Sequence, residues 1–130
     1  NSARKKGTDA AIKSDLANVR VAAEIYYDTF GNYGITVAPA TCPIVPVSTT
    51  STNMFLDGNS GMAAAIQDIV KTATAAKTLC ASTVTGWATA AELRAAGTGT
   101  FCVDSTGIPR IRPTGNISNA FTGSVCNTTP

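Results

Sequence analysis

The chain has 130 residues, of which 44% are apolar and 14% charged, and its net charge is +2. This composition fits one domain with a buried core and excludes an intrinsically disordered chain. The basic residues form one small cluster, Arg4, Lys5 and Lys6, which is too weak to predict a nucleic-acid interface. The sequence contains no histidine, the usual general base of hydrolytic enzymes, so we expect neither an enzyme nor a cofactor site.

A long amphipathic helix is predicted from about Arg4 to Thr29. Its apolar side chains recur at alternating steps of four and three residues, which places them on one helix face. This core face consists of Ile12, Leu16, Val19, Ala23, Tyr26 and Phe30. Asp9 and Lys13 are expected on the solvated side. Gly31-Asn32 is expected to end the helix. The start near Arg4 has no cap, which fits either a frayed terminus or the continuation of a longer helix.

The segment from Tyr33 to Asn53 is predicted to be an irregular loop. Its three prolines exclude a regular helix and a central strand. We expect Cys42 to pin this loop, because an unpinned loop of this length is unusual in a compact domain. A second helix is predicted from Met62 to Ala76, with Asn59 or Ser60 as its N-cap. Its apolar face consists of Met62, Ile66, Ile69, Val70 and Ala73.

Three β-strands are predicted in the last third of the chain. They span Ser82–Ala90, Gly99–Asp104 and Gly107–Arg112, and Asp104 opens a tight turn that ends at Gly107. The order of elements predicts an α+β domain in which a long N-terminal helix packs on a small antiparallel sheet of three to four strands. We divide the single domain, 1–130, into the helix (1–30), the loop and second helix (31–79), and the sheet with a cysteine-closed tail (80–130).

The four cysteines are spread widely and include no Cys-x-x-Cys pair, which favours two disulfides over a zinc site. Disulfides place the domain in an oxidising compartment. If Trp87 faces Phe101 across a hairpin, Cys80 lies beyond the strand that carries Cys102, and these two cannot be bridged. Two pairings then remain. One joins Cys42 to Cys80 and Cys102 to Cys126, and the other joins Cys42 to Cys102 and Cys80 to Cys126.

Two segments resemble the type IV pilin-like family, which includes type IVa major pilins and major pseudopilins. Residues 3–34, with the opening ARKKGTDAAIKSDLANVR and the helix exit AEIYYDTFGNYG, resemble the exposed half of the pilin helix. The turn FCVDSTG at Phe101–Gly107, preceded by the strand at Trp87, resembles a subset of bacterial pilins. The resemblance covers residues 80–112 less closely than 3–34, and it is weak between 35 and 79.

The resemblance implies a subunit whose helix continues upstream into an apolar half, which spans the inner membrane before assembly and forms the filament core afterwards. A conserved glutamate of the family belongs to that half. The chain would then be an extracellular, cell-surface protein, and its partners would be copies of itself and the inner-membrane assembly machinery. Such pili serve adhesion, motility or DNA uptake, and nucleic acid is not a required partner. The alternatives are a pseudopilin of a type II secretion system and an independent secreted binding module.

The resemblance also bears on individual residues. The cysteine-bounded C-terminal region of type IVa pilins favours the pairing Cys42–Cys80 with Cys102–Cys126. Arg4, Lys5 and Lys6 would lie at the membrane boundary or contact another subunit, although a solvated helix end explains them equally well. Some major pseudopilins bind calcium. Here the only grouping is Asp104 with Asn116 or Asn119, which has too few carboxylates, so we expect no metal. The aromatic residues Tyr26, Tyr27, Phe30 and Tyr33 are expected to fill the helix–sheet core rather than to bind sugar or transfer electrons. Of the four, Tyr27 and Tyr33 are the two expected to reach the surface.

Overall fold

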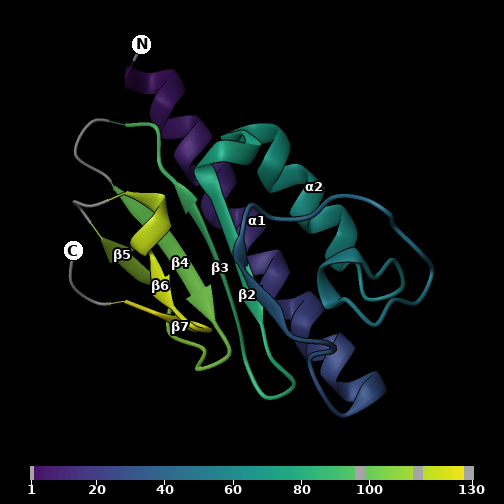
Figure 1. The fold of residues 1–130 in the computed structure, drawn as a ribbon. Coiled ribbons are helices and arrows are strands. Elements are labelled where there is room, and N and C mark those ends of the chain that lie inside the picture. Colours follow the sequence, from purple (N-terminus) through teal and green to yellow (C-terminus); the bar gives the residue numbers. More distant parts are fainter. Residues whose placement is uncertain (1, 96–98, 113–115, 128–130) are drawn as a thin grey trace.

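The computed structural model describes residues 2–95, 99–112 and 116–127, which are arranged in three layers (Figure 1). The first layer contains α1 (Ser2–Phe30) and α2 (Met62–Ala73), and the second is an antiparallel sheet. The third layer is a short hairpin of β6 (Phe121–Thr122) and β7 (Val125–Cys126) on the opposite side of the sheet (Figure 1). The α+β class, the long N-terminal helix and the short second helix are confirmed.

The sheet has five strands among the described residues, which is more than the three to four predicted. Neighbouring strands pair antiparallel and in chain order. The strands are β1 (Val37–Ala40), β2 (Thr78–Ser82), β3 (Trp87–Glu92), β4 (Thr100–Asp104) and β5 (Arg110–Arg112). The sequence did not predict most of β2, of which only Ser82 was in a predicted strand, or any of β1, which contains Pro39. β1 pairs only with β2, and an edge strand tolerates proline because one side of its backbone needs no partner.

The predicted strand Ser82–Ala90 is wrong, because a turn divides it into the end of β2 and the start of β3. The Thr83 hydroxyl accepts a hydrogen bond from the Gly86 backbone N–H at 3.1 Å, and the Thr83 N–H donates to the Gly86 carbonyl at 2.7 Å. Threonine is β-branched and common in strands, so a threonine that closes a turn with its hydroxyl cannot be told from a strand residue by its type alone. The alternating β-branched pattern of residues 82–90 therefore predicted one strand where the structure has a hairpin.

The predicted register between β3 and β4 is also wrong. Phe101 lies opposite Ala91 and Cys102 opposite Ala90, whereas Trp87 pairs with Ser82 of β2. The shift of four residues keeps each side chain on its expected face, because side chains alternate along a strand. It changes the residue opposite Cys102 from Gly86 to Ala90.

The apolar face of α1 is confirmed for five of its six residues. Ile12, Leu16, Val19 and Ala23 are completely buried, and Tyr26 is 3% exposed. Phe30 is 43% exposed, so its assignment to the core is wrong. Its ring lies against Tyr26, with 4.6 Å between centroids, and it borders an open groove at the last turn of the helix. The helix ends at Phe30, and Gly31 follows it as predicted, with φ +75° and an N–H that donates to the Tyr27 carbonyl at 2.7 Å.

Asp9 was predicted to be solvated together with Lys13, and the structure contradicts this. Asp9 is 5% exposed, and its carboxylate accepts hydrogen bonds from the backbone N–H groups of Arg94 and Ala95, the latter at 3.1 Å. Lys13 is half-buried, with its ammonium 5.7 Å from the centre of the Phe101 ring. Asp9 therefore fastens the start of α1 to the segment after β3, which sequence periodicity alone does not reveal.

The second helix begins at Met62 as predicted but ends at Ala73, three residues early. Thr74 has φ +75°, outside the helical region, and a short 3₁₀ turn follows. Met62, Ile66, Ile69 and Ala73 are buried, while Val70 is half-buried. Gly61 occupies the N-cap position, and the Ser60 hydroxyl accepts from the Met62 N–H at 3.2 Å. The predicted N-cap, Asn59 or Ser60, is therefore wrong. Ser60 lies one residue before the N-cap, where its hydroxyl satisfies one of the N–H groups that have no partner within the helix.

Both disulfides of the favoured pairing are present. Cys42 is bonded to Cys80, with 4.8 Å between Cα atoms, and Cys102 to Cys126, with 5.9 Å between Cα atoms. A Cys80–Cys102 bridge was excluded on the assumption that Trp87 faces Phe101, and that register is wrong. The structural reason is that Cys80 packs with α1 on one face of the sheet and Cys102 with the tail on the other.

Candidate assembly surfaces

The N-terminal turns of α1 project beyond the rest of the molecule (Figure 1). Every residue from Ser2 to Gly7 is exposed, including Arg4, Lys5 and Lys6, and Asp9 is the first buried residue of the helix. No helix in the described ranges is sufficiently long and apolar to span a membrane. The basic residues therefore form an accessible, positively charged surface at the projecting end of α1.

A shallow groove of about 290 Å³ runs between α1 and α2 on the side away from the sheet. Small side chains make up most of its walls, so the two helices approach closely. From α1 it is lined by Asn18, Val21 and Ala22, and from α2 by Ser60, Gly61, Ala64, Ala65 and Asp68. Val21 is 57% exposed beside it. This is an apolar surface on the outer side of a helix whose inner side fills the core.

Asp68 of α2 lines this groove, and the carboxyl of Asp15, one helical turn before Asn18 on α1, lies near enough to be affected by the Asp68 charge. Partial burial of Asp15, together with the nearby Asp68 charge, raises the pKa of the Asp15 carboxyl above its usual 3.8. Neither carboxylate forms a hydrogen bond or an ion pair within the described part of the chain. This part of the groove therefore has uncompensated negative charge.

The raised pKa of Asp15 makes the stability of the fold depend on pH. Since the folded state binds this proton more tightly than the unfolded state, the stability contributed by Asp15 is complete below its unfolded pKa. It is lost as pH rises through the higher folded pKa. Asp15→Asn should therefore raise the melting temperature near pH 7 and leave it little changed near pH 3. Asp28→Asn, at an exposed position on the same helix, is the control. A lower melting temperature for Asp15→Asn near pH 7 would contradict this expectation.

A second groove, of about 460 Å³, lies at the C-terminal end of α1. Phe30, Ile35 and Val84 give it an exposed apolar wall, and residues 50–52 form a polar rim. The Tyr26 hydroxyl donates to the Ser51 carbonyl at 2.7 Å and holds this rim against the helix. The groove has no charged lining residue among those described, and it was not predicted from the sequence.

The predicted aromatic cluster at the C-terminal end of α1 is partly buried and partly exposed. Tyr26 is in the core, whereas Tyr27 is 44% exposed and packs against the half-buried Tyr33, with 4.8 Å between ring centroids and the rings tilted by 44°. Gly34, which ends the exit motif, has φ +85°, and a Cβ there would lie 2.3 Å from the Thr52 carbonyl oxygen. The motif therefore requires glycine at this position, where two chain segments touch.

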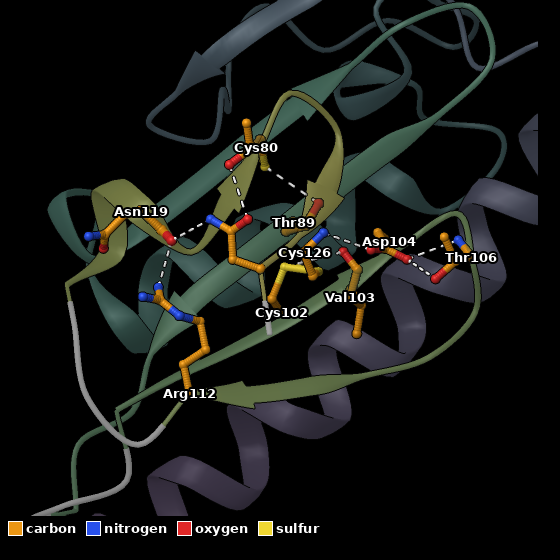
Figure 2. Close-up of a disulfide and its surroundings, with 11 residues drawn as sticks. Cys80, Thr89, Cys102, Val103, Asp104, Thr106, Arg112, Asn119 and Cys126 are labelled. Carbon is orange, nitrogen blue, oxygen red and sulfur yellow. Dashed lines mark hydrogen bonds between the residues drawn. A yellow bond between two sulfur atoms is a disulfide. The ribbon is translucent and has the colours of Figure 1, made fainter. Parts of the chain in front are cut away.

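The C-terminal tail is fastened to the sheet by a disulfide and a buried carboxylate (Figure 2). Asp104, at 2% exposure, accepts from the Thr106 N–H at 2.9 Å and from the Cys126 N–H at 2.8 Å. The first bond forms the turn predicted from the sequence, and the second joins this turn to the tail beside the Cys102–Cys126 disulfide. One carboxylate thus fixes both the β4 end and β7.

A buried arginine supports the same region. Arg112 is 1% exposed, and its guanidinium donates to the Asn119 carbonyl at 2.6 Å (Figure 2). The Asn127 amide donates to the same carbonyl at 2.9 Å. Ile111 and Val125 are more than half exposed nearby. The described part of the tail is therefore attached to the sheet at several points, and Val125 is exposed on its outer side.

The grouping considered for calcium does not assemble. Both Asp104 oxygens accept hydrogen bonds from the protein, and the Asn116 side chain accepts from the Ser118 N–H at 3.1 Å. The Asn119 side chain is exposed, and its carbonyl binds Arg112. Among the described residues, no three acidic, cysteine or histidine side chains converge on one point.

Comparisons of the chain with protein-family models, with curated proteins and with solved structures found no match.

Proposed function

We propose that the chain is a structural subunit of an extracellular type IV pilus, which assembles through an apolar helix upstream of α1. The observation that carries this proposal is the form of α1. One helix of 29 residues has its first buried residue at Asp9, and its exposed first turns extend past the body (Figure 1). A helix shared between a globular body and a projecting end suits a protein that assembles through that end.

The remaining features support an exported structural protein. Two disulfides suit an oxidising compartment. One of them fastens the proline-rich loop and the other closes the tail, which favours an exposed pilus over a type II secretion pseudopilin. In this proposal the subunit is held in the inner membrane before assembly and is at the cell surface afterwards. Its chemistry is the packing of helices and of complementary surfaces, without catalysis.

Reading the gene upstream of Asn1 distinguishes this proposal from an independent secreted module. A pilin requires an apolar segment of about 20 residues that runs directly into α1. The resemblance further implies that this segment begins with Phe after a Gly and carries a Glu soon after. A cleavable signal peptide that ends at Asn1 would contradict the proposal.

A further inference from the structure

We propose that the basic first turns of α1 in one copy, with Lys5 and Lys6, dock at the α1–α2 groove of a second copy, beside Asp15 and Asp68. The inference rests on the proposed function and specifies which surfaces meet within the assembly. It commits to a second copy of this chain as the occupant of the groove.

The groove matches the chemistry of a lysine side chain. A lysine has an apolar four-carbon stem and a charged head, which prefer different surroundings. The walls supplied by Val21, Ala22 and Ala65 are apolar, and Asp68 also lines the groove. A stem that lies along these walls brings its ammonium group to the two carboxylates.

Charge complementarity selects the partner surface. Lys5 and Lys6 are exposed at the projecting end of α1, where another molecule can reach them (Figure 1). At the groove, partial burial and the nearby Asp68 charge raise the pKa of Asp15, and neither carboxylate has an ion-pair partner within the described residues. Lys71 is exposed three residues after Asp68 and forms no ion pair with it. A cation from outside would relieve the repulsion between Asp15 and Asp68.

The same chain cannot supply that cation from Lys5 or Lys6. Both residues are on the same continuous helix as Asp15, nine or ten residues away, which is roughly 14–15 Å along the axis. This distance exceeds the reach of an ion pair. The contact must therefore form between two copies.

Charge reversal tests the inference in filaments formed by the full-length protein. Lys5→Glu with Lys6→Glu should lower filament yield about tenfold or more, and so should Asp68→Lys, because each places like charges together. Combining all three substitutions should restore most of the yield. Asp28→Lys makes the same charge change as Asp68→Lys at an exposed position outside the groove and is the matched control. Melting curves of each purified chain check that these exposed substitutions leave the fold intact.

A second measurement locates the contact directly. Carbodiimide joins an amine to a carboxylate only when they touch, and in wild-type filaments it should join Lys5 or Lys6 to Asp15 or Asp68. If filaments form but show no such cross-link and no rescue by combination, this inference is overturned and the proposed function stands. If the chain is absent from filaments altogether, both are overturned.

Discussion

Replacing Leu16 with aspartate should unfold most of the domain. Leu16 is completely buried between α1 and the sheet, within the cluster that includes Ile66 and Val103. A carboxylate there would lose the apolar contacts of leucine and would have to be desolvated or protonated. We expect a loss of at least about 4 kcal/mol, which approaches the whole stability of a typical domain. Urea unfolding followed by circular dichroism measures it.

The matched control is Ser14→Asp, on the same helix and exposed to solvent. It should change the stability by less than about 0.5 kcal/mol. Lys13 is unsuitable as a control, because its ammonium lies over the Phe101 ring. Equal losses from Leu16→Asp and Ser14→Asp would mean that the core face of α1 is assigned to the wrong side.

Removal of either disulfide should cost about 3–4 kcal/mol in the chain-entropy model. The Cys42–Cys80 bridge joins residues 38 positions apart, and the Cys102–Cys126 bridge joins residues 24 positions apart. The first should therefore contribute slightly more to the free energy of unfolding. The double variants Cys42→Ala with Cys80→Ala, and Cys102→Ala with Cys126→Ala, compared with wild type in urea, measure each contribution.

Peptide mapping without reduction checks the pairing itself. A peptide linking Cys42 to Cys80 and another linking Cys102 to Cys126 are expected. A peptide linking Cys42 to Cys102 would contradict the pairing. Four free thiols would in addition remove the support for an oxidising compartment.

The sequence predicted the elements whose signals are local. The steps of four and three along α1 placed Ile12 and Val19 in the core, and the glycine at position 31 marked the helix end. The turn from Asp104 to Gly107 was recognisable because its residues satisfy its own backbone. These features need no knowledge of what lies far away in the chain.

The missed features depend on distant segments. The carboxylate of Asp9 is buried because the backbone at Arg94 needs an acceptor, and no helical pattern encodes that need. β3 was difficult to delimit because both of its faces are covered, by helices on one side and the tail on the other, so its burial does not alternate. The α1–α2 groove exists only where the small residues Ala22 and Ala65 of two helices meet. Such sites require the fold.

The most direct test of the account is whether this chain is a component of surface filaments. Filaments sheared from cells that carry the gene should contain the chain as a main protein by mass spectrometry, and antibodies against the domain should label them along their length by immunogold microscopy. Cells that lack the gene provide the control. Detection of the chain only as free protein in the periplasm or medium, with filaments unlabelled, would contradict the proposal that it is a pilus subunit.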